Sequence, residues 1–229
     1  MFINAIILLE KNVKINKKQQ WNGRKPNIGR ETYIETLTPI QLDEMVEEFL
    51  IRTRRILIVG EIDETMSAHV CSYLQFLATE SQPVYIYIHS HGGCFASGYA
   101  IIDQMLTCGC PIYTIVRGHG YSMGAIIAAF GTNGHRYATP NSSLMLHSIS
   151  IQNVSEPIEQ HKKMTTYLLN DYRTKLVSLS KRLKITMKQL IKLMDETAWI
   201  SPKQAIKIGL IDGIWTPSLE RSIVQELNK

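Results

Sequence analysis

The chain has 229 residues, of which 45% are hydrophobic and 20% charged, and it carries a net charge of +5. This length can bury a core as one domain with an added arm, and the dispersed lysines and arginines match no nucleic-acid-binding module, so we expect no nucleic-acid partner. The apolar stretch at residues 2–9 is too short to cross a bilayer, and its lysines follow it, opposite to a secretory signal; we therefore expect no membrane association.

The cysteines are too few and too irregularly spaced for a disulfide framework. Cys108 and Cys110 form a Cys-x-Cys pair without the second pair that a zinc site requires. We therefore expect no metal and a reducing compartment, either the cytoplasm or, for an organellar protein, the plastid stroma.

The composition changes near Thr38. Residues 10–36 are rich in Lys, Asn, Gln and Arg, so residues 1–37 are predicted to form an N-terminal arm that is mobile or removed by processing. Thr38, Pro39 and Gln41 then combine an N-cap, a proline at the first helical position and a capping-box partner. We expect the folded domain to occupy residues 38–229.

Strand and helix patterns alternate from there on. The predicted strands are 55–59, 84–88, 112–116, 136–138, 144–147 and 210–214, and the helices between the first three lie at 63–77 and 96–106. Strand, helix, strand in this order predicts an α/β fold with parallel pairing and right-handed crossovers.

The second part of the domain is predicted to be mainly helical. Residues 155–183 have helical apolar spacing, and at about 1.5 Å of rise per residue this helix is longer than a domain of this size usually covers, so part of it is expected to project or to contact another subunit. Capping boxes at Thr186–Gln189 and Ser201–Gln204 begin two shorter helices, and Gly209 can end the second of them.

Ser122 lies in a small-residue turn between a predicted strand and an apolar helix. A serine at the first turn of a helix is held clear of the backbone beside free N–H groups, which suits a nucleophile. The alternative is a serine that only caps the helix. The choice between the two depends on which other groups meet Ser122.

Two further polar segments follow strands at the same expected sheet edge, where ligands of α/β proteins bind. Gly92 and Gly93 follow the strand at 84–88, and the N–H groups of Gly93 and Met123 could form an oxyanion hole, although a glycine pair also suits a plain turn. Of seven histidines, His147 is the preferred general base because it ends an apolar strand; the alternative is a core histidine with satisfied hydrogen bonds.

Four segments together resemble the ClpP family, the proteolytic subunits of Clp proteases. The resemblance covers residues 50–215 and rests on Gly92-Gly93, Ser122-Met123-Gly124-Ala125, Pro140 to His147, and Trp199-Ile200-Ser201-Pro202 with Ala205 and Gly209 to Asp212.

The resemblance implies a serine endopeptidase with a crotonase-like core of repeated β-β-α units and a protruding handle helix at about 155–183. It assigns Ser122 as nucleophile, His147 as base, and the N–H groups of Gly93 and Met123 as the oxyanion hole. It also implies heptameric rings stacked as a tetradecamer, in which residues 1–37 would form an axial loop.

The implied partners are an AAA+ ATPase, polypeptide substrates and, in a mixed ring, other Clp subunits. The chain itself needs no cofactor, because the partner hydrolyses ATP. Tyr85 and Tyr87 match aromatic positions in the family's docking pockets for that ATPase.

The third member of the triad departs from the family pattern. The alignment through Trp199-Ile200-Ser201 places Thr197 at the position of the acid, with Glu196 and Asp195 directly before it. A neutral threonine could orient the imidazole of His147 but could not stabilise its cation. Thr197 and Glu196 both remain candidates.

Three functions are therefore considered. An active Clp-type endopeptidase is favoured. A catalytically impaired Clp subunit with a structural role in a mixed ring is the alternative that Thr197 suggests. A crotonase-type acyl-CoA hydratase or isomerase would share the oxyanion hole but would need a carboxylate and not the serine and histidine.

Overall fold

The computed structural model describes residues 39–150 and 158–227. Contacts divide the chain into two units, residues 1–45 and 46–229, and the fold concerns the second. Helix α3 (Pro39–Arg52) contains residues of both units and begins at the proline expected to start it. The predicted arm at residues 1–37 lies outside the described residues.

A mostly parallel sheet forms the centre of the second unit. Its strands are β1 (Arg55–Ile62), β2 (Val84–Gly93), β3 (Ile112–Tyr121), β4 (Arg136–Ala138), β5 (Ser143–Leu146), β6 (Ala198–Ile200) and β7 (Gly213–Ile214). The order is β1-β2-β3-β4-β7, and β5 pairs with both β3 and β6. Among the strands of the described residues, only β5 and β6 pair in the antiparallel sense. The predicted α/β fold with parallel pairing is confirmed.

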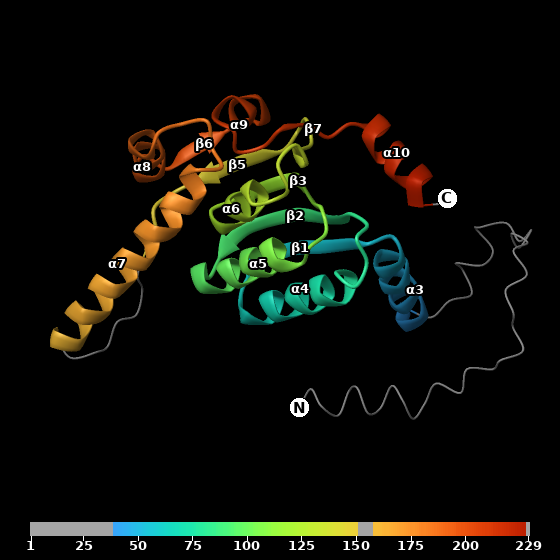
Figure 1. The fold of residues 1–229 in the computed structure, drawn as a ribbon, viewed down its shortest axis with the longest axis horizontal. Helices are drawn as coiled ribbons and strands as arrows, with labels where there is room; N and C mark the ends of the chain where they lie inside the picture. The colour runs from blue at the N-terminus through green and yellow to red at the C-terminus, as the bar shows by residue number, and fades with distance from the viewer. Residues whose placement is uncertain (1–38, 151–157, 228–229) are drawn as a thin grey trace, which may run out of the picture. The chain divides into compact units, whose positions relative to one another are not determined.

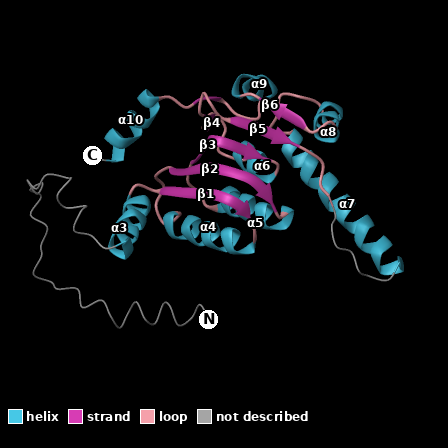
Figure 2. Ribbon diagram, turned by 180° about the vertical axis from the view of Figure 1, so that it is seen from behind, coloured by secondary structure: helices cyan, strands magenta, loops and turns pink. Residues whose placement is uncertain are grey.

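Three helices connect these strands and lie against the sheet. They are α4 (Glu64–Leu77), α5 (Phe95–Thr107) and α6 (Met123–Ala129), and Figure 1 and Figure 2 show α4 and α5 side by side along the same face. The shorter helices α8 (Met187–Asp195) and α9 (Pro202–Ile208) begin at the two predicted capping boxes, which are both formed.

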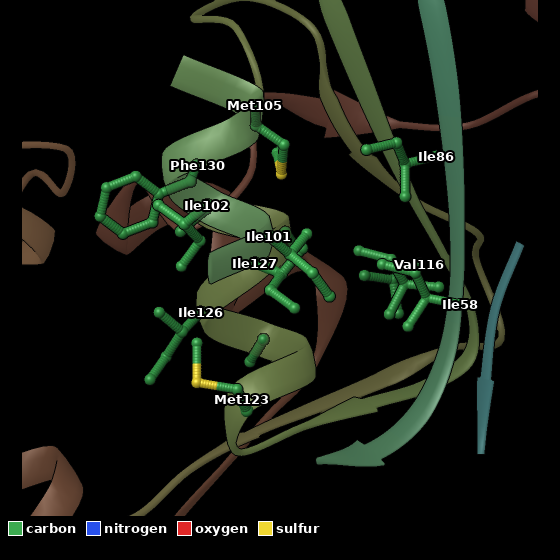
Figure 3. Close-up of a cluster of buried hydrophobic side chains, with 14 of the residues drawn as sticks. Ile58, Ile86, Ile101, Ile102, Met105, Val116, Met123, Ile126, Ile127 and Phe130 are labelled. Atoms are coloured by element: carbon green, nitrogen blue, oxygen red, sulfur yellow. The ribbon is translucent and has the colours of Figure 1, made fainter. Parts of the chain in front are cut away.

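The core lies between the sheet and these helices. Ile58, Ile86 and Val116 of the strands face Ile101 and Ile127 of α5 and α6 (Figure 3), and all of these side chains are buried. The residues that alternate with them along β1 point to the other face. Leu57 and Val59 there are 42% and 53% exposed, so this face of β1 is left open by the rest of the second unit.

Helix α7 (Ile158–Ser180) is the long helix that the sequence predicts. Residues 155–157 of the prediction lie outside the described residues, and the helix ends three residues before the predicted end at 183. Tyr172, Leu176 and Leu179 are buried near its C-terminal end, whereas Tyr167 is 70% exposed. In Figure 1 the N-terminal half extends away from the sheet, as expected of a handle. Among the described residues, none of the helices combines the length and the apolar character of a membrane span.

The last helix, α10 (Pro217–Leu227), was not predicted. Ile223 of α10 and Trp215 just before it form a second apolar cluster with Tyr85 and Tyr87 of β2. The two tyrosines are only 2% and 4% exposed. The aromatic positions that the family resemblance assigns to a docking pocket are therefore covered here by the chain's own C-terminal segment.

A buried ion pair joins β4 to the segment before β7. The Arg136 guanidinium donates to both carboxylate oxygens of Asp212, at 2.8 and 2.5 Å, and the Arg136 side chain is only 5% exposed. Burial would raise the pKa of Asp212, but hydrogen bonds and charge from Arg136 outweigh it and lower that pKa. The carboxylate therefore contributes stability above its unfolded pKa, and this contribution is lost as the pH falls through its lower folded pKa.

Replacing Asp212 with asparagine should destabilise the fold by about 3 kcal/mol at neutral pH, because it leaves the buried Arg136 charge without its counter-ion. Thermal unfolding followed by tryptophan fluorescence measures the effect. Asp103→Asn, which changes an exposed carboxylate on α5, is the matched control. The difference between the two variants should shrink below pH 4; equal melting temperatures at pH 7 would contradict the role of the pair.

Candidate active site

Ser122 occupies a strained turn between β3 and α6. Its φ of 53° and ψ of −118° lie outside the regions that an L-residue normally adopts, and it stands at the N-cap position without a side-chain capping hydrogen bond. The next residue, Met123, is 2% exposed. A Cβ on Gly98 of α5 would lie 2.2 Å from the Met123 Cγ, so Met123 is packed closely onto that glycine. The core thus anchors the turn, while the Ser122 hydroxyl is not used as a cap.

The glycine pair at the end of β2 abuts this turn. Gly92 has a φ of 100°, and its N–H donates to the Ser90 Oγ at 3.0 Å. A Cβ on Gly92 would lie 2.8 Å from the Cβ of Ser122 and 3.1 Å from the backbone nitrogen of Met123. Only glycine permits this approach, which brings the Gly92–Gly93 backbone beside both Ser122 and the Met123 N–H.

His147 lies just beyond the strand that flanks the turn. The Ser122 N–H donates to the carbonyl of Met145 at 2.8 Å, and His147 follows two residues later, one residue beyond the end of β5 at Leu146. The imidazole Nδ1 is 2.6 Å from the carbonyl oxygen of Ser148. A carbonyl only accepts, so Nδ1 carries the proton and Nε2 is left as the basic nitrogen.

Thr197 and His147 lie directly beyond the same end of the β5–β6 ladder. The antiparallel ladder ends at the pair Leu146 and Ala198, so His147 and Thr197 are the first residues beyond it. The Ser148 N–H then donates to the Met194 carbonyl and does not continue the register. Thr197 has a φ of 51°, which is unusual for a β-branched residue. Among the described residues, its side chain makes no hydrogen bond to the His147 ring.

The two acidic neighbours of Thr197 point to other partners. The Glu196 carboxylate is 63% exposed and lies 3.8 Å from the Lys192 ammonium. The Asp195 carboxylate accepts a hydrogen bond of 2.8 Å from the Ser148 hydroxyl. Neither carboxylate therefore contacts the imidazole of His147 directly.

Helix α7 reaches the same segment through Tyr172. Burial raises the pKa of Tyr172, and its interactions with the Ser148 side chain and the Ile149 backbone oppose that rise. The contacts of Ser148 with Asp195 and Tyr172 were missed from the sequence. No periodicity or spacing indicates them, because they depend on how the segment after β5 turns toward α7 and α8.

Two of the competing histidines, His89 on β2 and His119 on β3, lie against each other. The rings of His89 and His119 lie 4.0 Å apart between centroids, and burial together with the charges of His89 and His91 lowers the pKa of His119. Within the described ranges, no group of three His, Cys, Asp or Glu side chains is placed to hold a metal ion.

A parallel-sheet α/β fold with a serine turn, a glycine pair and a histidine near one sheet edge is compatible with a hydrolase but does not by itself define one. Comparison with known proteins gives the family. The chain matches the Clp protease family over residues 41–218. It is also 31% identical, over 176 residues, to the "ATP-dependent Clp protease proteolytic subunit" of Ligilactobacillus salivarius (strain UCC118), an alignment that covers 72% of this chain and 84% of that relative.

The chain therefore belongs to the Clp protease family, which makes it a peptidase and implies an oligomeric assembly. The family resemblance predicted from Gly92-Gly93, Ser122 and His147 is confirmed at the level of the family. The roles of individual residues remain predictions.

Proposed function

We propose that the chain is a serine endopeptidase in which Ser122 is the nucleophile and His147 the general base. The observation that carries this proposal is the Ser122 turn, which is strained, anchored by the core and not used as a helix cap. The N–H groups of Gly93 and Met123 are the proposed oxyanion hole, and the close approach of Gly92 to Ser122 supports it.

In this mechanism His147 Nε2 takes the proton of the Ser122 hydroxyl as Oγ attacks the carbonyl carbon of the scissile peptide. The tetrahedral oxyanion accepts hydrogen bonds from the Gly93 and Met123 N–H groups. Its collapse breaks the C–N bond, and His147 gives the proton to the leaving amine. Water, deprotonated by His147, then hydrolyses the ester on Ser122 and restores the enzyme.

The proposed substrates are unfolded polypeptides, cleaved to short peptides inside heptameric rings stacked as a tetradecamer. The name of the Ligilactobacillus relative describes a subunit of an ATP-dependent protease, which supports an AAA+ ATPase as partner and ATP hydrolysis by that partner. Two surfaces are available for neighbouring subunits. One is the exposed half of α7, and the other is the open face of β1, where Leu57 and Val59 are exposed.

The assay is cleavage of fluorogenic peptides by the assembled protein, with enoyl-CoA hydration measured in parallel. We expect peptide cleavage that a serine-directed organophosphate inhibits, and no hydration. Native mass spectrometry gives the ring size of the same sample. Hydration activity would favour a crotonase-type enzyme. A ring that cleaves no peptide, with or without an AAA+ ATPase, would instead match a catalytically impaired subunit in a mixed ring.

A further inference from the structure

The imidazole of His147 is oriented by its own neighbour in the chain. Its Nδ1 lies 2.6 Å from the Ser148 carbonyl oxygen, which can only accept a hydrogen bond. This bond selects the tautomer in which Nε2 is basic. Selecting that tautomer is one of the two tasks of a triad acid; the other is to stabilise the imidazolium that forms.

The Ser148 peptide is in turn fixed by the end of α8. The Ser148 N–H donates to the Met194 carbonyl at 3.0 Å, and the Ser148 hydroxyl donates to the Asp195 Oδ1 at 2.8 Å. The first bond holds the backbone and the second holds the side chain of the same residue. A hydrogen bond to a carboxylate is stronger than one between neutral groups, so Asp195 helps to hold Ser148, the residue whose carbonyl accepts from His147.

The alternatives for this task are less well placed. Glu196 pairs with Lys192 on the surface of α8. Thr197 lies directly beyond the end of the β5–β6 ladder, as His147 does, yet within the described residues the ring bonds to Ser148. Asp195 is therefore the carboxylate that contacts the segment containing His147. It contacts Ser148 and not the imidazole itself.

We propose that the Ser148 carbonyl replaces the triad acid in orienting His147, and that Asp195 is a positioning residue acting through the Ser148 hydroxyl. This inference rests on the proposed function, in which His147 is the general base. A carbonyl orients the ring without supplying a full negative charge, so the site is expected to be slower than one with an acid opposite the imidazole.

The test is a double-mutant cycle on peptide hydrolysis with Ser148→Ala, Asp195→Ala and the double variant. Each single change should lower kcat on the order of 10-fold with KM unchanged, since a misplaced base slows the chemical step. The double variant should be no slower than Ser148→Ala alone, because that variant already removes the hydroxyl through which Asp195 acts. Ser148→Thr keeps the hydroxyl and should restore kcat, and Glu196→Ala, which removes the adjacent exposed carboxylate, should leave it unchanged.

Additive losses in the double variant, or an equal loss in Glu196→Ala, would overturn the proposal. A readout independent of turnover is the ¹⁵N spectrum of histidine-labelled rings, with the His147 signal assigned by its absence in His147→Gln. We expect a protonated Nδ1 in the wild type and a mixture of tautomers in Asp195→Ala. If the wild type shows that tautomer but cleaves no peptide, the proposed function fails and the positioning network stands. If it cleaves peptide and the tautomer is unaffected by Asp195→Ala, the network fails.

Discussion

Replacing Thr197 with aspartate is expected to raise kcat for peptide hydrolysis, by on the order of 10²- to 10⁴-fold at neutral pH. His147 directly follows β5 and residue 197 directly precedes β6, its antiparallel partner, so we expect the new carboxylate to lie near the imidazole. It would stabilise the imidazolium that forms when Ser122 loses its proton. The Ser148 carbonyl, which is neutral, provides orientation but little of this charge stabilisation.

The backbone favours this substitution. Thr197 has a φ of 51°, a conformation in which β-branched residues are strained and Asp and Asn are comparatively frequent. Thr197→Asp should therefore fold at least as well as the wild type. A gain in kcat would then not be offset by a loss of folded protein.

Thr197→Asn is the matched control, because it relieves the same backbone strain but carries no charge. Rates of fluorogenic peptide cleavage are compared for the three proteins at equal concentrations of assembled ring. The account requires a large gain for aspartate and little change for asparagine. Equal rates for the two variants would show that residue 197 does not face the base.

Removing the nucleophile should have the opposite effect. Ser122→Ala is expected to lower kcat by roughly 10⁴- to 10⁶-fold, and His147→Ala by a similar factor, because the hydroxyl and its base act as one unit. The variant that combines Ser122→Ala and His147→Ala should have a kcat no lower than that of either single variant. Alanine keeps the Cβ that serine already holds at φ 53°, so the turn and the ring should remain intact, which native mass spectrometry checks.

Ser72→Ala is the control for this series, since Ser72 is an exposed serine on α4 that donates to the carbonyl of Ala68. It should cleave peptide at the wild-type rate. Peptide cleavage retained by Ser122→Ala at more than a small fraction of the wild-type rate would rule out Ser122 as the nucleophile.

The local signals in the sequence predicted much of the fold because they coincide with tertiary structure. The apolar run at 84–88 is the buried half of β2, and the capping boxes at Thr186 and Ser201 form as expected. The strand itself extends to Gly93, farther than its apolar run, because the glycines continue the pairing with β1. That extension carries the glycine pair to Ser122.

Helix α10 could not be predicted because its stabilising contacts come from distant parts of the chain. Glu220 accepts hydrogen bonds from Arg55 and Arg117 on β1 and β3, and from the Trp215 indole. In the sequence, Glu220 is one charge in a polar segment. Only the folded sheet brings the two arginines together beside it.

The residues of the candidate site could be predicted from the sequence, but the hydrogen bonds that join them could not. The turn chemistry of Gly92-Gly93 and Ser122 is visible in sequence because it depends on residue type. The bond from His147 to the Ser148 carbonyl depends on how the chain turns after β5, and the contact of Ser148 with Asp195 joins segments 47 residues apart. The residue at the acid position, Thr197, therefore gave an incomplete view of what orients His147.

The central claim is that the Ser122 hydroxyl is an activated nucleophile, and covalent labelling tests it most directly. Assembled wild-type protein is incubated with a fluorophosphonate, digested, and analysed by mass spectrometry to locate the adduct. The account predicts one phosphonylated residue, Ser122, with labelling abolished in Ser122→Ala and strongly reduced in His147→Ala. An adduct on another serine, or an assembled ring that remains unlabelled, would contradict it.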